Sequence, residues 1–352
     1  MGEPLQTEIR ADCAAATGDG AGLERLRNQR ILITGGTGFM GTWLAETIAY
    51  LNDARSFGID LHLLSRNLSR FSAAVPHLAK RGDVHLIGNQ VSEVRCLPAG
   101  VTYVIHAAGT PDNRVHASDP LGTLRTIAGG TSAILQAAFD SRDDIQKILV
   151  VSSGLVYGAQ PLELPRISET HAGGPEPDSI TAVYAEAKRY GETVGAAWRS
   201  QFKLPVVTAR PFAFMGPYQG LDKPWAVNNF LRDALLGAPI RILGDAQTVR
   251  SYMYPSDMAH WILRILAAGV PGTAYNVGSP HAITLDDLAH RIGASMAEPI
   301  GVVCRPLGEP RVTRFVPDVT RAQSELGLGI TVDLDTAISR TLEWHRANER
   351  SK

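Results

Sequence analysis

Three side chains that could move a proton stand at informative spacings in this chain: Ser153, Tyr184 and Lys188. Tyr184 and Lys188 are four residues apart in a segment with helical periodicity, which places a phenol and an ammonium on one face of a helix. A nearby cation favours the phenolate, so the pair predicts a tyrosine that exchanges a proton nearer to neutral pH. Ser153 ends an apolar run, residues 148–153, at what would be the carboxyl edge of a sheet. Taken alone, Tyr-x-x-x-Lys is a common pair on helix surfaces, so its chemistry depends on the elements around it.

A glycine-rich turn near the start of the chain supplies those elements. The apolar run 30–34 is followed at once by Gly35, Gly38 and Gly41, and residues 39–51 then carry apolar side chains at helical spacing. In such a turn the first glycine allows the bend, the second lets the backbone approach a pyrophosphate, and the third lets helix and strand pack closely. The start of the helix offers free N–H groups and the positive end of its dipole. Strand, turn and helix together predict a dinucleotide-binding site, with an ordinary glycine-rich turn as the lesser interpretation.

The rest of the chain continues as alternating strands and helices. Such alternation predicts a parallel sheet with right-handed crossovers and helices on both faces. The predicted strands are residues 30–34, 60–64, 84–87, 102–107, 148–153, 205–210 and 274–277, and the predicted helices include 119–139, 180–202, 225–236, 251–267, 285–296 and 332–347. Prolines and glycines after Arg210 mark a long loop where the regular pattern weakens.

The predicted fold is therefore α/β, a Rossmann-like doubly wound parallel sheet with a smaller α/β C-terminal substrate lobe. Residues 1–28 are small and polar, and we expect a flexible N-terminal extension that ends in a short helix. Residues 29–212 plus about 248–279 would form the NAD(P)-binding Rossmann domain. Residues of about 213–247 plus 280–352 would form the substrate-binding lobe.

Composition excludes several classes of function. A formal net charge of −1 over 352 residues gives no electrostatic case for nucleic acid or an anionic membrane as partner. No apolar stretch reaches membrane-spanning length, and residues 1–20 lack the pattern of a secretory signal. Cys13, Cys96 and Cys304 are far apart and odd in number, which predicts a reduced, cytoplasmic protein without a disulfide framework. The ten histidines show no metal-ligand spacing, so we expect no metal site and assign them packing or surface roles.

With these motifs in this order, the chain resembles the extended short-chain dehydrogenase/reductase family, the NAD-dependent nucleotide-sugar epimerases and dehydratases. The resemblance runs from about Arg30 to the C-terminal tail. Beyond the glycine turn and the Tyr–Lys pair, its motifs are His106-Ala-Ala-Gly109, Ser152-Ser-Gly-Leu-Val-Tyr-Gly158, Arg210-Pro-Phe-Ala-Phe-Met-Gly-Pro217 and Arg250-Ser-Tyr-Met-Tyr-Pro-Ser-Asp257.

The resemblance implies a role for each catalytic residue. Tyr184 would take a proton from a sugar hydroxyl while a hydride passes to the nicotinamide. Lys188 would hold the ribose hydroxyls of the cofactor, and Ser153 would hydrogen-bond the reacting oxygen. The cofactor-binding residues that it implies are Gly35, Gly38, Phe39, Met40, Gly41, Ser65, Arg66, Gln90, Val91, Ala107, Ala108, Gly109, Tyr184, Lys188 and Pro211.

The same resemblance implies a nucleotide-sugar substrate, carried on UDP, dTDP, CDP or GDP, and a homodimer that pairs helices 119–139 and 180–202. The substrate residues that it implies are Thr110, Ser153, Asn228, Asn229, Arg250 and Arg311. Arg250 would pair with the diphosphate, because a forked guanidinium suits phosphate oxygens. A second phosphate-binding arginine is expected among Arg305, Arg311 and Arg314, and for each arginine a solvated surface side chain is the alternative.

Two positions depart from the family pattern at the cofactor. Ser65 stands where many NAD-using members place an acid for the ribose hydroxyls. Arg66 beside it could meet the 2′-phosphate of NADP or stack on adenine. NAD is the expected cofactor on family habit, and NADP remains compatible with this pair.

A third departure bears on the reaction. The 4,6-dehydratases usually carry Asp-Glu directly after the catalytic serine, and related decarboxylases carry a Glu, whereas this chain has Gly154 and Leu155. Ala213 stands where many members carry an asparagine that touches the substrate. The sequence therefore predicts an epimerase that transiently oxidises the sugar, commonly at C4, with Tyr184 as base. A 4,6-dehydratase or decarboxylase is one alternative, and a non-catalytic NAD(P)-binding sensor is another, although a sensor needs no proton-transfer residues.

Overall fold

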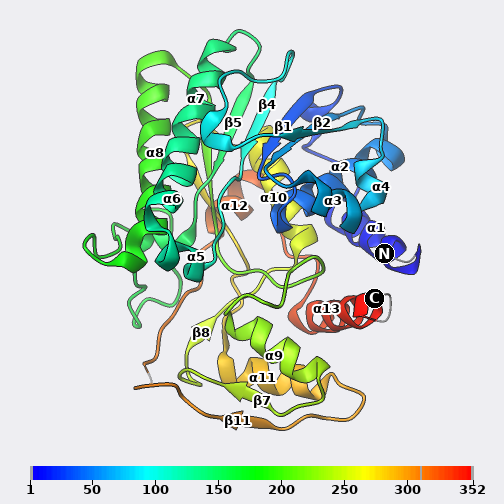
Figure 1. Cartoon of the computed structure of the whole chain (residues 1–352), viewed down its shortest axis with the longest axis vertical. Coiled ribbons are helices and arrows are strands. Elements are labelled where there is room, and N and C mark those ends of the chain that lie inside the picture. Colours follow the sequence, from blue (N-terminus) through cyan, green and yellow to red (C-terminus); the bar gives the residue numbers. More distant parts are fainter. Residues whose placement is uncertain (1–2, 310, 350–352) are drawn as a thin grey trace.

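A seven-stranded parallel sheet forms the upper part of the molecule in Figure 1, which is a computed structural model describing residues 3–309 and 311–349. The strand order is β3-β2-β1-β4-β5-β6-β9, and every pair is parallel. The strands are β1 (Arg30–Thr34), β2 (Asp60–Ser65), β3 (Val84–Gly88), β4 (Tyr103–His106), β5 (Lys147–Val151), β6 (Val206–Pro211) and β9 (Ala274–Val277). The order reverses between β1 and β4, the point at which doubly wound sheets bind their ligands. The predicted fold class is confirmed.

Helices cover both faces of this sheet, with α7 and α8 along one side and α1 and α2 on the other (Figure 1). Their bounds are α1 (Glu3–Thr17), α2 (Phe39–Arg55), α3 (Leu68–Ala74), α4 (Pro76–Ala79), α5 (Asn113–Ser118), α6 (Pro120–Leu124), α7 (Gly130–Asp140), α8 (Val183–Phe202), α10 (Pro255–Ala268) and α12 (Thr320–Leu326). Short turns of helix are η1 (Glu24–Leu26), η2 (Val91–Glu93), η4 (Gly154–Tyr157), η5 (Ile180–Ala182) and the π-helical turn η3 (Arg125–Gly129). The helix expected over 119–139 is therefore present as the continuous run of α6, η3 and α7.

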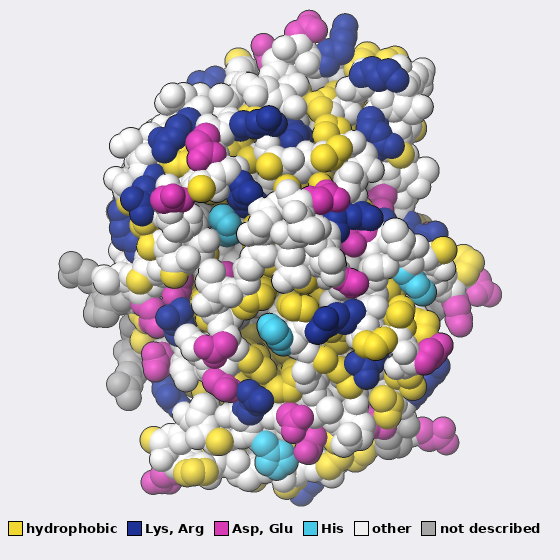
Figure 2. All heavy atoms as spheres, turned by 180° about the vertical axis from the view of Figure 1, so that it is seen from behind, with side chains coloured by type: hydrophobic (Ala, Val, Ile, Leu, Met, Phe, Trp, Pro, Cys, Tyr) yellow, Lys and Arg dark blue, Asp and Glu magenta, His cyan; other side chains and the backbone are white. Residues whose placement is uncertain are grey.

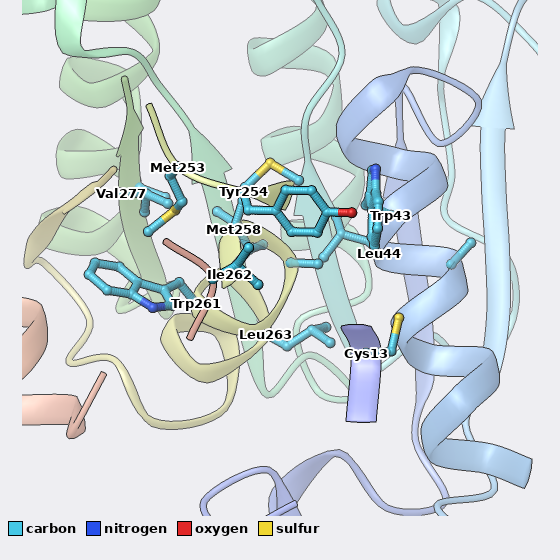
Figure 3. Close-up of a cluster of buried hydrophobic side chains, with 14 of the residues drawn as sticks. Cys13, Trp43, Leu44, Met253, Tyr254, Met258, Trp261, Ile262, Leu263 and Val277 are labelled. Atoms are coloured by element: carbon cyan, nitrogen blue, oxygen red, sulfur yellow. The ribbon is translucent and has the colours of Figure 1, made fainter. Parts of the chain in front are cut away.

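The strand period explains the two cores. Successive side chains of β1 point to opposite faces, so Ile31 and Ile33 join one core with α2 and α10, and Leu32 joins the other with α7. Figure 3 shows the first core, in which Trp43 of α2 meets Tyr254 with ring centroids 5.7 Å apart. This packing fixes the strand and helix on either side of the glycine turn.

The first residues of the chain correct one prediction. Residues 1–28 were expected to be flexible, but α1 packs against α2 and α10 and buries Ile9 and Cys13. The Asp12 carboxylate of α1 accepts a hydrogen bond from the Tyr254 hydroxyl at 2.7 Å and pairs with Arg340 at 2.5 Å. The apolar residues of α1 recur at helical spacing, and the glycines that follow the helix obscured this pattern. Met1 and Gly2 lie outside the described residues.

A smaller lobe lies below the sheet (Figure 1). It holds α9 (Ala226–Leu235), α11 (Leu285–Ala294), the parallel pair β7 (Ile240–Ile242) and β11 (Val302–Cys304), and the antiparallel pair β8 (Val249–Arg250) and β10 (Ile283–Thr284). The last helix, α13 (Leu334–Glu349), contacts α9, whereas α12 lies against β9 and α10 on the sheet. Within residues 3–309 and 311–349, the helices all fall short of the length and apolar character needed to cross a bilayer.

Figure 2 shows the side of the molecule opposite to that of Figure 1. A hollow lined largely by hydrophobic side chains lies on this side between the upper and lower parts of the molecule. Elsewhere on this face, Lys and Arg side chains alternate with Asp and Glu side chains (Figure 2).

Candidate active site

The glycine turn between β1 and α2 has the backbone of a phosphate cradle. Gly35 has a φ of +70°, and a Cβ there would lie 2.8 Å from the Ala107 carbonyl oxygen. A Cβ on Gly41 would collide with the Gly36 carbonyl, because the first turn of α2 lies against the turn itself. At Gly38 a Cβ would lie 3.3 Å from the Gly35 carbonyl oxygen, a tight contact but a milder one than at Gly35 or Gly41. The backbone thus requires glycine at Gly35 and at Gly41, while the approach of a pyrophosphate at Gly38 stays a prediction.

The start of α2 completes the cradle. Gly38 is its N-cap residue and provides no side-chain acceptor, and the first helical hydrogen bond runs from Thr42 N to Gly38 O. The N–H groups of Phe39, Met40 and Gly41 therefore precede any helical acceptor and remain to bind an anion. These residues fit the pyrophosphate of NAD.

The far end of the predicted cofactor site lies at the carboxyl ends of β2 and β3. The Ser65 hydroxyl accepts a hydrogen bond from the Thr37 hydroxyl at 2.6 Å, which ties the end of β2 to the glycine turn. Arg66 and Gln90 are exposed, and the Gln90 amide donates to Glu93 at 3.1 Å. Val91 is buried. A ribose and an adenine at this edge would meet Ser65 and Arg66, with no carboxylate supplied at either position.

Ser153, Tyr184 and Lys188 come together as predicted, although they derive from two elements. All three are more than nine-tenths buried. Ser153 and Tyr184 share a hydrogen bond, and the Lys188 ammonium lies 5.8 Å from the centre of the Tyr184 ring. The Lys188 Nζ also donates to the Val151 carbonyl at 2.7 Å, which fixes α8 against the end of β5. The predicted proton-transfer residues therefore form one buried cluster at the carboxyl edge of the sheet.

The charges of this cluster differ from the expectation. Burial raises the pKa of Tyr184 to about 12, and the hydrogen bond with Ser153 lowers it by less. Burial also lowers the pKa of Lys188 to about 8, with Glu192 acting in the opposite direction. The cation therefore does not bring the phenol toward neutral pH in the protein alone, because desolvation disfavours both charged forms.

Two histidines that were assigned packing or surface roles lie against this cluster. The His116 ring stacks on the Tyr184 ring with centroids 4.7 Å apart, and its Nε2 lies 2.6 Å from the Thr110 carbonyl. His106 is buried between the Thr34 and Thr131 hydroxyls, and burial lowers its pKa to about 3, so it is neutral. Spacing gave no signal for His116, because α5 and α8 meet only in the folded chain.

At Gly154, directly after Ser153, there is no room for a side chain without movement. A Cβ on Gly154 would come within 2.8 Å of ring carbons of both Phe212 and Phe315. These two rings stack on each other with centroids 4.5 Å apart, and Phe212 directly follows Pro211, the end of β6. Leu155 is 46% exposed. Aromatic carbon thus surrounds the position that a side chain at residue 154 would occupy.

The predicted substrate residues are only partly supported. Asn228 is fully buried, with its amide bonded to Gln219 and Gly220, and Asn229 accepts from Arg232. Both asparagines therefore hold the lobe together instead of facing a ligand. The family resemblance predicted a phosphate contact from the type and order of these residues. It could not predict the direction in which their side chains point.

Two of the candidates for the second phosphate-binding arginine, Arg311 and Arg314, differ in their surroundings. Arg311 is exposed, whereas Arg314 pairs across a β-bridge with Val249, the neighbour of Arg250. The buried Nε of Arg314 has no hydrogen-bond partner in the part of the chain that the structure describes. Arg250 binds the Thr313 hydroxyl at 2.9 Å. A buried donor without a partner is costly unless a ligand completes it, so Arg314 fits an anion site better than Arg311 does.

The sheet, the phosphate cradle and the buried Ser–Tyr–Lys cluster define an NAD-dependent enzyme of the Rossmann class. Comparison with known proteins identifies the family within this class. The chain belongs to the NAD dependent epimerase/dehydratase family, whose model matches residues 31–278. NAD is the cofactor of this family. The expected family and cofactor are confirmed.

Relatives carry more than one activity. UDP-glucuronic acid decarboxylase 2 of Arabidopsis thaliana is 28% identical over 307 residues, covering 87% of this chain and 65% of the relative. The match thus spans less than two thirds of that relative's length. A dTDP-glucose 4,6-dehydratase of Streptomyces niveus is 27% identical over 330 residues, covering 91% of this chain and 93% of the relative.

Solved structures show the same fold. The UDP-glucuronic acid 4-epimerase of Bacillus cereus, in complex with UDP-glucuronic acid and NAD, superposes with a TM-score of 0.77 at 18% identity. The superposition covers 91% of this chain and 100% of that one. DesIV, a dTDP-glucose 4,6-dehydratase of Streptomyces venezuelae with NAD and TYD bound, gives 0.76 at 22% identity and covers 92% and 98% of the two chains.

Proposed function

We propose that this enzyme is a nucleotide-sugar 4-epimerase that oxidises the sugar at C4 and returns the hydride to the opposite face. One observation carries the proposal: Ser153, Tyr184 and Lys188 are buried together beside the cradle, while Gly154 and Leu155 provide no acid for elimination. UDP-glucuronic acid is the first substrate to test. It is named in the decarboxylase relatives and is bound in the Bacillus cereus epimerase structure.

Each residue has a defined task in this reaction. The Tyr184 phenolate takes the proton of the C4 hydroxyl, and the Ser153 hydroxyl donates to the same oxygen as it becomes a carbonyl. Bound NAD supplies the hydride acceptor, and its cationic ring favours the phenolate that burial alone disfavours. The keto sugar then rotates in the pocket and presents its opposite face. Tyr184 returns the proton to the C4 oxygen as the hydroxyl forms again. Lys188 holds the ribose and keeps a positive charge near the phenolate.

Elimination or decarboxylation would require an acid from another position. Glu186 follows Tyr184 closely on α8, but its side chain is 39% exposed and lies 3.5 Å from Arg189. Glu192 is bonded to both Ser152 and Arg210. Decarboxylation is the second candidate, because several relatives are decarboxylases by name and oxidation of a glucuronic acid at C4 creates a β-keto acid.

Incubation with UDP-glucuronic acid and with dTDP-glucose in D₂O separates these reactions. Epimerisation at C4 breaks no bond at C5, so the expected product has the substrate's mass and no carbon-bound deuterium. Decarboxylation gives a product without CO₂ and with deuterium at C5, and dehydration gives a product without water and with deuterium at C5. Either of these last two products, measured by mass spectrometry, would overturn the epimerase assignment.

The diphosphate of the substrate is assigned to Arg250 and Arg314. Their segments adjoin through the Val249–Arg314 bridge, and two guanidinium groups can neutralise a diphosphate between them. Thr110 and Ser153 remain the proposed contacts to the sugar. Ser153 is hydrogen-bonded to Tyr184, and the Thr110 carbonyl contacts His116, whose ring stacks on Tyr184.

The enzyme is also proposed to be a homodimer. Large apolar side chains are exposed on α6 and on the η5–α8 helix, which contact each other: Leu121, Leu124, Ile180, Tyr190 and Phe202. Burial of such a face between two copies would remove these side chains from water. Light scattering at micromolar concentration should report twice the mass of one chain, and a monomer would contradict the pairing.

A further inference from the structure

We propose that Glu192 is a positioning residue of the catalytic centre, acting as a partly buried counter-charge of Lys188 and as the tether between α8 and the end of β5. This inference rests on the proposed function for its effect on turnover. Its direct readout, the ionisation of Lys188 in the protein alone, does not depend on that function.

Glu192 lies one helical turn after Lys188, on the same face of α8. Its Oε1 accepts a hydrogen bond from the Ser152 hydroxyl at 2.5 Å, and Ser152 directly precedes the catalytic Ser153. The guanidinium of Arg210 on β6 binds both carboxylate oxygens, through Nε at 2.9 Å and Nη2 at 2.6 Å. One carboxylate thus connects the helix of Tyr184 and Lys188 with two strands of the sheet.

Arg210 is itself held in place by a chain of buried hydrogen bonds. Its Nη1 donates to the Tyr157 hydroxyl at 2.8 Å, and that hydroxyl donates to Asn276 Oδ1 at 2.8 Å. The Asn276 amide then donates to the Ile167 and Asp318 carbonyls, each at 2.9 Å. Because these hydrogen bonds fix the Arg210 guanidinium, its bidentate pair with Glu192 also fixes the position of the Glu192 carboxylate.

The charge of Glu192 matters because Lys188 has little else to balance it. The ammonium faces the Tyr184 ring on α8, the Val151 carbonyl on β5 and the neutral His106 on β4. Burial lowers the pKa of Lys188, and Glu192 is the charged group that opposes this shift. Removing that charge should therefore lower the pKa of Lys188 further and leave less ammonium at neutral pH.

The other surroundings of Glu192 bear on how it can be tested. It lines a polar cleft of about 250 Å³ together with Glu169, His171, Arg189 and Arg210. Glu169 accepts from the Asn276 backbone N–H, and Arg189 donates to the Val156 and Gly173 carbonyls. Because water can reach this cleft, the neutral and nearly isosteric variant Glu192→Gln should fold.

The decisive experiment compares Glu192→Gln with Glu186→Gln, a carboxylate on the same helix that is half exposed and pairs only with Arg189. The ionisation of Lys188 is followed by NMR of protein labelled at lysine Cε, with the signal assigned through Lys188→Met. We expect its pKa to fall by about one unit in Glu192→Gln and to stay unchanged in Glu186→Gln. An unchanged Lys188 pKa in Glu192→Gln would overturn the proposal, whether or not any nucleotide sugar is turned over.

Turnover provides the second readout. The alkaline limb of the kcat/KM profile should move to lower pH in Glu192→Gln by the same amount, while KM for the sugar stays within about twofold. Ser152→Ala keeps the charge but removes one tether, so it should lower kcat without moving the limb. This variant also keeps the proposal falsifiable if Glu192→Gln does not fold: a Ser152→Ala enzyme with the parent's kcat would contradict the tether.

Discussion

The cofactor half and the substrate half of the site are held together in different ways. In the cofactor half, glycines between β1 and α2 and a four-residue spacing on α8 place the groups through local backbone geometry. In the substrate half, side chains place the groups: Arg250 bonds to Thr313, 63 residues away in the sequence, and Asn228 bonds to Gln219 and Gly220 in the loop before its helix. Motifs therefore predict positions in the first half but only residue types in the second.

This difference also separates the expected effects of substitutions. Changes in the cofactor half should act on folding, cofactor affinity or the chemical step, because the backbone itself makes the site. Changes in the substrate half should act on the affinity for the nucleotide sugar, because side chains form the site there and several of them hydrogen-bond to one another.

The largest effect is expected from Tyr184→Phe, which removes the proton acceptor but leaves the ring stacked on His116. Its kcat should fall by about 10³-fold, while the dissociation constant of NAD stays within about threefold. Tyr190→Phe on the same helix is the matched control, since its hydroxyl lies 3.0 Å from Ser132 at the surface. Turnover of Tyr184→Phe at the parent's rate would remove Tyr184 from the chemistry.

Two glycine variants should break the cradle in different ways. Gly41→Ala drives a methyl group into the Gly36 carbonyl and should lower the free energy of unfolding by about 1–3 kcal/mol, seen in chemical denaturation. Gly38→Ala meets one milder contact, with the Gly35 carbonyl at 3.3 Å, so it should cost less stability than Gly41→Ala while weakening NAD by about tenfold in calorimetry. If Gly38→Ala bound NAD as the parent does, the backbone at this position would not approach the pyrophosphate.

In the substrate half, Arg314→Gln and Arg311→Gln sharpen the choice between two arginines. Arg314 carries a buried donor without a partner among the described residues, and Arg311 is exposed. Arg314→Gln should raise KM for the nucleotide sugar by about tenfold or more with kcat nearly unchanged. Equal steady-state constants for the two variants would show that neither lies at the diphosphate, or that both do.

The smallest effect concerns cofactor choice. Arg66 is exposed at the end of β2, where it could reach the 2′-phosphate of NADP. Arg66→Ala should weaken NADP by about tenfold and NAD by no more than about twofold, measured by titration of the protein alone. An equal loss for both cofactors would leave Arg66 with adenine stacking as its only role.

The sheet could be predicted because its signals are local. Strands β1 and β9 begin and end where the apolar runs do, and the glycine turn carries its own geometry. Helix α1 was missed because its few apolar residues stand among polar ones. Their role becomes clear only in the folded chain, where they pack against α2 and α10. The helix expected over 119–139 is present as one continuous run, but its π-helical turn η3, where Ile127 packs with Tyr184, was not predicted.

The site shows the same limit. Ser153, Tyr184 and Lys188 were predictable from spacing and order, but the pKa of Tyr184 was not, because burial has no sequence signature. His116 was invisible for the same reason: it reaches the phenol only when α5 folds against α8. Glu192 could have been found at helical spacing from Lys188, but its partner Arg210 lies on a separate strand.

Return of the hydride to C4 separates epimerisation from 4,6-dehydration, and retention of the C6 carboxylate in the product separates it from decarboxylation. UDP-glucuronic acid and dTDP-glucose carrying deuterium at C4 are converted in H₂O, and the deuterium in each product is located by NMR and mass spectrometry. Transient oxidation at the Tyr184 cluster predicts an epimer that keeps its deuterium at C4. Deuterium transferred to C6, or lost to solvent during the first turnover, would contradict it.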